Sequence, residues 1–234
     1  MRASAQDQLQ IGGNVLNVKI ISSDDTGIKV KKGEAVVQYP WGQIQGIAMP
    51  PPAESATAIA AYQAAKADPT KWPAAEAALK KVIETYPRLP TPWMEDATLG
   101  LIEANGNTGK IKEAEELLKK FKAWYPRSPR VLNAVASMAQ GLITAKRFDD
   151  AVALIDKAIG DKRKQLAVTD DEGKALGAAM NAMGACYEAK GDLSKALDSY
   201  LATKVLYFHD PATLKVAVEK TDALKPKVAA RANK

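Results

Sequence analysis

Cysteine and histidine are almost absent from this chain, which holds one of each, Cys186 and His209, among its 234 residues. One cysteine excludes an intramolecular disulfide, and one histidine excludes a metal site built from several histidines of one chain. We expect Cys186 to be a buried thiol, with a nucleophile or an intermolecular disulfide as the alternatives. No nucleophile is paired with His209 in the sequence, so we expect it to serve the helix start at Asp210-Pro211 rather than a catalytic triad.

Long apolar runs are also missing, because no segment reaches the ~18–20 residues that a helix needs to span a bilayer.

A complete phosphate-binding loop is missing too. The stretch 105–110 reads NGNTGK, but Ala104 stands where the first glycine belongs and Ile111 replaces the serine or threonine. We interpret this stretch as a turn between two helices.

Two acidic clusters, 149–150 and 170–172, are the remaining candidates for a metal site. Both fall where helices are predicted to begin, and carboxylates at that end interact favourably with the helix dipole. We therefore expect them to stabilise helices rather than to bind metal. Since no catalytic constellation is visible, the sequence predicts no enzyme, no metal and no cofactor.

What the chain does contain is a repeat. The stretch 75–90 reads AEAALKKVIETYPRLP and the stretch 114–129 reads AEELLKKFKAWYPRSP, with nine of sixteen positions identical. The offset is 39 residues, and a period between ~20 and ~50 residues is typical of helical repeat arrays. In such arrays one unit cannot bury its own apolar face and needs its neighbours. We therefore expect an α-helical scaffold.

Apolar spacing and turn residues predict four helix pairs and a final capping helix. Thr169 and Glu172 have the spacing of a capping box at the start of the fourth pair. Thr91-Pro92 and Ser128-Pro129 read as a cap followed by a proline in the first helical turn. The expected helices begin near residues 53, 73, 92, 110, 129, 149, 170, 193 and 211.

The first fifty residues read differently. Short β-branched runs separated by turn clusters predict four strands of a small antiparallel sheet. The strands are expected at 14–21, 28–31, 35–39 and 41–48, with Ile44 and Ile47 buried in the last. Trp41 is expected to be a core residue in contact with the first helices, or an exposed binding aromatic.

The resulting domain prediction has four parts. A β module with a flexible start occupies 1–49, and a stiff proline linker occupies 50–52. A helical repeat domain follows at 53–224, and a basic tail at 225–234.

The helical units resemble tetratricopeptide repeats (TPR), whose pattern is W-x2-L-G-x2-Y, then alanine, an aromatic and proline. The fourth unit matches best, with Met183-Gly184, Tyr187, Ala196 and Tyr200 at the corresponding positions. The key alanines fall at 75, 114, 151 and 196, a spacing more irregular than the ~34 residues of the family. The resemblance implies a mainly α fold, an α–α superhelix of about four helix pairs with a capping helix.

Two further resemblances bear on location. The β module is similar to the SH3-like modules that precede helical repeats in some bacterial envelope proteins. The joints Tyr86–Pro90 and Tyr125–Pro129 resemble those of periplasmic and outer-membrane-assembly TPR proteins. Ala3-Ser4-Ala5 has the form of a signal-peptidase site, although the apolar segment that should precede it is missing. We therefore expect a periplasmic or envelope location, with the cytoplasm as the alternative.

The TPR resemblance implies that a partner binds in a concave groove lined by the first helix of each pair. It implies no catalytic residues in that groove. Polar side chains in that groove could bond the backbone of an extended peptide. The residues at these positions are Asn133, Ala136, Gln140, Thr144, Asn181, Ala185 and Glu188.

We therefore expect a non-catalytic scaffold that binds a protein or peptide, or a second copy of the chain. The net charge is +6, and lysine pairs recur at 80–81 and 119–120. As an alternative, the chain could therefore be a basic adaptor that binds nucleic acid or an anionic membrane or glycan surface.

Overall fold

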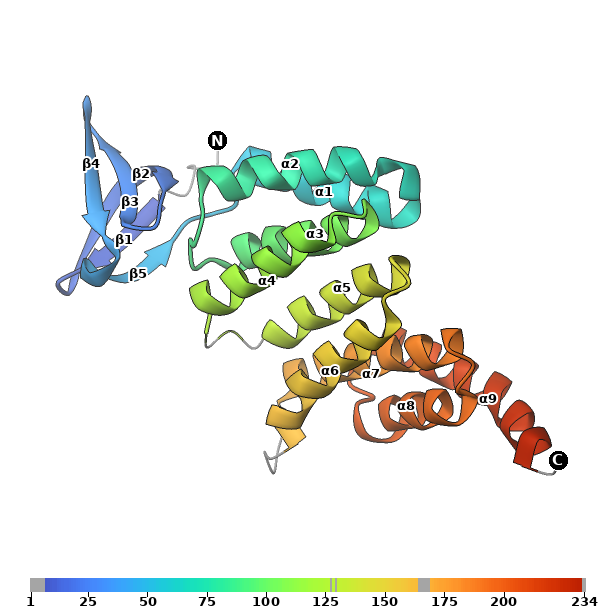
Figure 1. Cartoon of the computed structure of the whole chain (residues 1–234). Coiled ribbons are helices and arrows are strands. Elements are labelled where there is room, and N and C mark those ends of the chain that lie inside the picture. The colour runs from blue at the N-terminus through green and yellow to red at the C-terminus, as the bar shows by residue number, and fades with distance from the viewer. Residues whose placement is uncertain (1–6, 127, 129, 164–168, 233–234) are drawn as a thin grey trace. The chain divides into compact units, whose positions relative to one another are not determined.

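The computed structural model describes residues 7–126, 128, 130–163 and 169–232 (Figure 1). The chain divides into two compact units. The first unit holds the residues up to Ala104 together with 123–125, and the second holds 105–122 and the residues from Pro126 onward. The β sheet and the first helices therefore belong to one unit, although three prolines separate them in sequence.

The N-terminal sheet has five antiparallel strands in the order β4-β3-β2-β1-β5. Its strands are β1 (Asp7–Ile11), β2 (Asn14–Ser23), β3 (Gly27–Lys32), β4 (Ala35–Pro40) and β5 (Ile44–Ala48). Its core contains Leu9, Ile20, Ile28 and Val30, all buried. The alternation predicted for 14–21 and 28–31 is confirmed, because the residues between these apolar positions are more exposed.

The prediction of four strands was wrong, because β1 lies in the segment that we expected to be a flexible start. β1 and β2 are joined by Gly12 and Gly13, whose φ angles are 56° and 78°. Two residues with positive φ give the type I′ turn that suits a two-residue hairpin, so the Gly-Gly pair was a usable signal. The last predicted strand was also too long. Residues Trp41–Gln43 form a 3-10 turn, and Ile44 and Ile47 are only half-buried.

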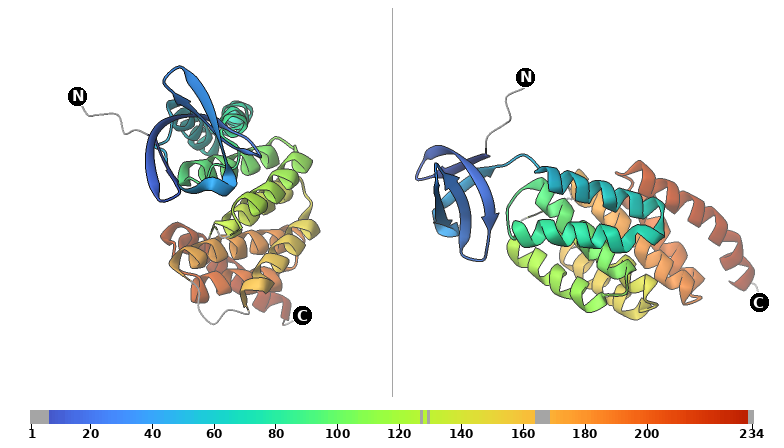
Figure 2. Two further views of the ribbon diagram at one scale, coloured as in Figure 1. Left: turned by 90° about the vertical axis from the view of Figure 1, so that its left-hand side faces the viewer. Right: turned by 90° about the horizontal axis from the view of Figure 1, so that it is seen from above.

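The helices of the first unit are α1 (Ala53–Ala67), α2 (Trp72–Thr85) and most of α3 (Pro92–Asn107), and a 3-10 turn joins the first two. α1 and α2 pack against each other as a hairpin (Figure 2). Gly100 of α3 lets the helix approach this hairpin, since a Cβ there would lie 3.2 Å from Leu79 and 3.4 Å from Tyr62. Small residues at such positions allow close helix packing, as the repeat pattern predicted.

The second unit contains the end of α3 and most of α4 (Ile111–Trp124), followed by five further helices. These are α5 (Val131–Thr144), α6 (Phe148–Arg163), α7 (Asp170–Ala189), α8 (Leu193–Leu206) and α9 (Pro211–Ala232). The predicted capping box is confirmed at the start of α7, where Thr169 and Glu172 bond reciprocally. α9 continues through Pro226, so residues 225–232, which we expected to form a tail, are helical.

Glycines set the closest helix contacts of the second unit. A Cβ on Gly106 would lie 2.5 Å from the Cα of Gly141 in α5, so the two backbones touch. In α7, Gly177 and Gly184 leave room for the carbonyl of Tyr207 and for the ring of Tyr200. Helices α7, α8 and α9 pack on one another in this way (Figures 1 and 2).

Candidate functional site

The predicted groove positions of α5 form one polar, accessible row. Asn133, Gln140 and Thr144 are exposed, and Ala136 is partly exposed. The opposite face of the helix is apolar and buried through Leu132, Val135, Met138, Ala139 and Leu142. Among the described residues, the side-chain amides of Asn133 and Gln140 make no hydrogen bond. They are therefore available to bond an external group.

The predicted positions of α7 are used by the chain itself. Asn181 donates from Nδ2 to the carbonyl of Thr213 at 2.9 Å, and its Oδ1 is buried without a partner among the described residues. Glu188 accepts from the hydroxyl of Tyr200 and from Lys220, both at 2.8 Å. Thr213 and Lys220 belong to α9, so the side chains of Asn181 and Glu188 both bond the capping helix. Ala185 between them is partly exposed.

The charge state of Glu188 follows from these contacts. Burial raises its pKa, but the hydrogen bonds from Lys220 and Tyr200 outweigh burial, and the pKa lies below the ordinary value. Glu188 therefore stays ionised and paired at neutral pH. Since its charge is already neutralised, we assign it to the packing of α9 rather than to a free binding surface.

A cavity of about 340 Å³ lies on the other side of α5, between α4 and α6. Leu118, Met138, Leu142 and Leu154 form its apolar part. Its charged rim is internally paired, because Arg147 bonds Glu115 at 3.2 Å and Asp150 at 2.7 Å. The hydrogen bond to Asp150 raises the pKa of Arg147. The cavity thus offers apolar volume beside a rim whose opposite charges are paired.

The recurring lysines are also partly neutralised. Lys80 lies 3.8 Å from Glu84 in α2, and Lys119 lies 2.6 Å from Glu116 in α4. Exposed pairs of this kind contribute little to stability, but they lower the local positive potential. The helices therefore give limited support to the basic-adaptor alternative.

The single cysteine and the single histidine both pack against neighbouring parts of the chain. Cys186 is fully buried in α7, and burial raises its pKa to about 11. His209 packs on the backbone of Gly173, where a Cβ would lie 2.4 Å from Nδ1, and it stacks on Phe208. Asp210 accepts a hydrogen bond from the backbone N–H of Thr213 and caps α9. Each residue is engaged in packing or capping.

The described residues hold no candidate for a metal-ligating cluster or for a membrane-spanning helix. These residues contain no group of three or more His, Cys, Asp or Glu side chains placed to hold a metal ion. Within the same part of the chain, no helix combines the length and the apolarity needed to cross a bilayer. Ala3-Ser4-Ala5 lies outside the described residues, as do Arg127 and Pro129 of the second joint.

The first Tyr-Pro-Arg joint has a role that the sequence did not reveal, because it docks the sheet on the helices. The hydroxyl of Ser23 donates to the carbonyl of Pro87 at 2.7 Å, and Arg88 donates to the carbonyl of Asp25 at 3.2 Å. The Arg88 guanidinium also lies over the ring of Trp41. Trp41 is only half-buried, so it is not the core residue that we expected, and it contacts the joint after α2 rather than a helix.

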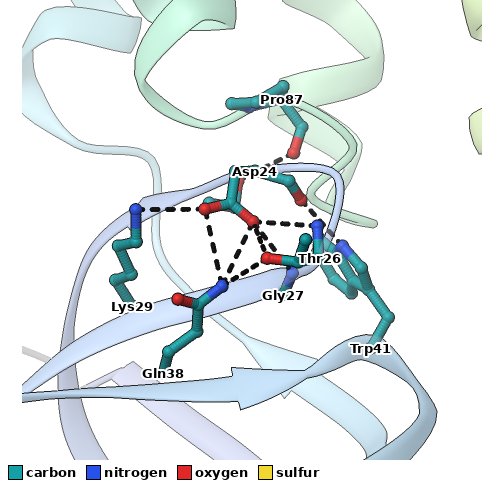
Figure 3. A network of polar contacts seen from close by, with 8 residues as sticks. Asp24, Thr26, Gly27, Lys29, Gln38, Trp41 and Pro87 are labelled. Atoms are coloured by element: carbon teal, nitrogen blue, oxygen red, sulfur yellow. Dashed lines mark hydrogen bonds and ion pairs between the residues drawn. The ribbon is translucent and has the colours of Figure 1, made fainter.

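The turn that receives this joint is fixed by Asp24 (Figure 3). Its carboxylate accepts hydrogen bonds from Thr26 and from the N–H of Gly27, and it pairs with Lys29 at 3.0 Å. The hydrogen bond from the Thr26 side chain, followed by that from Lys29, holds the pKa of Asp24 far below its ordinary value. The backbone carbonyl of Asp24 accepts from Nε1 of Trp41 at 2.8 Å.

No family model and no curated protein matches the sequence. The chain is similar to a crystal structure of a Podospora anserina protein, described as a kinesin light chain with nearly identical TPR-like repeats. The identity is 16%, the TM-score is 0.51, and the match covers 77% of this chain and 87% of that chain. At this identity the likeness shows the fold alone. The chain therefore has a TPR-like helical repeat fold, preceded by a five-stranded antiparallel sheet.

Proposed function

We propose that this chain is a non-catalytic scaffold that binds an extended segment of a protein partner along α5. The observation that carries the proposal is the row formed by Asn133, Ala136, Gln140 and Thr144. The row is accessible, and its two amides have no partner among the described residues. A side-chain amide can donate to a peptide carbonyl and accept from a peptide N–H, which suits recognition of an extended backbone.

The binding surface that we propose includes fewer residues than the sequence predicted. Asn181 and Glu188 bond α9 in the free chain, so they serve the partner only if α9 moves. Ala185 leaves space beside them without offering a hydrogen bond. We therefore assign recognition to α5 and treat the α7 positions as packing residues.

The test is site-specific photocrosslinking in the native cell, with the crosslinker at Gln140. Another exposed position on a different helix, Asp156 of α6, serves as the control. We expect a discrete adduct from position 140 that weakens when Asn133→Ala is added and that is absent from position 156. Equal adducts at both positions, or no effect of Asn133→Ala, would remove α5 from the proposal.

We further propose that the scaffold works in the bacterial cell envelope. The Tyr-Pro-Arg joints and the Ala3-Ser4-Ala5 start support this location by resemblance. Fractionation of native cells with an antibody against the chain tests it. Recovery in the cytoplasmic fraction would contradict the proposal and leave the α5 assignment untouched.

A further inference from the structure

β4 is an outer strand of the sheet (Figure 1). An outer strand has one edge whose backbone N–H and C=O groups no neighbouring strand bonds. In an antiparallel pair, opposite residues alternate between those that exchange both hydrogen bonds and those that exchange none. The N–H of Trp41 donates to the carbonyl of Thr26, which sets this alternation. In the register of β3 and β4, Val37 and Tyr39 then bond β3, while Val36 and Gln38 direct their N–H and C=O outward.

β4 itself lacks two of the usual protections against pairing, a charged residue and a bulge. Natural edge strands carry charges, bulges or covering segments that stop another chain from adding to them. β4 reads AVVQYP, with no charged residue and with its proline at the end. Val36 is 59% exposed, and none of the described residues bonds the outward N–H groups of Val36 and Gln38.

The solvent face beside this edge carries two lysines, Lys19 of β2 and Lys31 of β3, that have no ion pair among the described residues. Lys29 lies on the same face but is paired with Asp24 at 3.0 Å, so its charge is neutralised. Lys19 and Lys31 stand directly opposite each other across β2 and β3, and Lys31 stands opposite Val36. Like charges in directly opposite positions destabilise a sheet, and a bound anion beside them would relieve this repulsion.

From this arrangement we infer that β4 binds an extended acidic peptide, which adds to the sheet as a sixth strand. Its backbone bonds the outward groups of Val36 and Gln38. Its carboxylates occur at alternate positions, because alternate side chains of a strand share one face. They therefore lie on the solvent face, the face of Lys31, which stands opposite Val36 in the register of β3 and β4. This surface uses none of the α5 residues, so the inference does not depend on the proposed function.

Two other occupants fit less well. A second copy pairing β4 with β4 would bring its own lysines to the same face, which repels at low ionic strength. Single-stranded nucleic acid needs aromatic rings on which its bases stack. The aromatic residue of β4, Tyr39, lies opposite buried Ile28 and therefore on the inner face.

The probe is a short blocked peptide of alternating glutamate and valine, with an alternating lysine and valine peptide as its control. NMR on the full chain follows the amide hydrogen exchange of Val36 and Gln38. We expect the acidic peptide to slow exchange at these two amides by at least about tenfold, since each gains a hydrogen bond. The lysine peptide should leave both unchanged, and raising the salt from about 50 to about 300 mM should weaken acidic-peptide binding.

Two variants locate the site. Val36→Pro removes an N–H that β3 does not use, so we expect an unchanged melting temperature and a loss of affinity of about tenfold. Val36→Thr keeps the N–H and a β-branched side chain, and it should bind like the parent. Lys31→Glu should reverse the preference in favour of the lysine peptide.

Three results would overturn the inference. One is no binding of the acidic peptide up to about 1 mM. Another is binding that Val36→Pro leaves intact. The third is a result that assigns the edge to another occupant. Either a single-stranded oligonucleotide binds more tightly than the peptide, or the chain self-associates in a salt-resistant way that Val36→Pro abolishes.

Discussion

The guanidinium of Arg88 lies over the indole ring of Trp41, with Cζ 5.4 Å from the ring centroid. This contact joins the Tyr-Pro-Arg joint after α2 to the 3-10 turn before β5. Arg88 has a φ of 64°, an unusual value for a residue with a side chain. Because the joint holds this strained conformation while it contacts the sheet, we infer that docking of the sheet selects it.

Replacing Arg88 tests this relationship. Arg88→Ala loses the cation–π contact and the bond to Asp25, and we expect it to lower the free energy of unfolding by about 1–2 kcal/mol. Arg88→Gly loses the same contacts but relieves the positive φ, so it should be more stable than Arg88→Ala by about 1 kcal/mol. Urea denaturation of the three proteins measures both differences. Equal stability of the two variants would show that φ at this position is not strained.

We predict that Asp24 makes the sheet-to-helix junction sensitive to acid. Its folded pKa lies far below the ordinary value of 3.8, so its bonds stabilise the fold fully above that value. This stability is lost as the pH falls below about 4 toward the folded pKa. We expect Trp41 fluorescence to report loosening of the turn in that range. In Asp24→Asn this acid-dependent part should be missing, and the stability should already be lower at pH 7.

The matched control for this pH dependence is Asp222→Asn, since Asp222 is exposed on α9. Its pH profile should follow that of the parent protein. If Asp24→Asn also follows the parent profile, the network of Figure 3 does not govern acid stability.

The helices were predictable because their signals are local. Thr169 and Glu172 encode a cap within four residues, and their reciprocal bonds are present. Leu99-Gly100 and Met183-Gly184 encode close packing, and both glycines lie against large side chains. A 3.6-residue period and a cap need no knowledge of the rest of the chain.

The features that were missed depend on partners far apart in sequence. β1 is too short for its alternation to stand out, and it is held by pairing with both β2 and β5. The same holds for the candidate site. The TPR pattern predicts that Asn181 and Glu188 line a groove, but it does not indicate that they bond Thr213 and Lys220 of α9.

Cys186 offers a probe of the second unit. It is fully buried, and with a pKa of about 11 roughly one thiol in a thousand is ionised at pH 8. We therefore expect a thiol reagent such as DTNB to react with it only as fast as the protein opens. In Cys186→Ala/Ala189→Cys the thiol moves to an exposed position of the same helix and should react promptly. Prompt reaction of the parent protein would revive the nucleophile alternative.

The contact between Gly106 and Gly141 gives the sharpest packing prediction. A Cβ on Gly141 would lie 2.6 Å from the Cα of Gly106, and backbone cannot move aside as a flexible side chain can. We expect Gly141→Ala to lower the free energy of unfolding by about 1–3 kcal/mol. Gly160→Ala is the control, because a Cβ there meets no atom within 4 Å. As a helical residue it should gain about 0.5–1 kcal/mol from the same substitution. Calorimetry of both variants measures the two effects. An equal gain in stability at both positions would mean that a Cβ at position 141 costs nothing and that helix propensity alone sets the result.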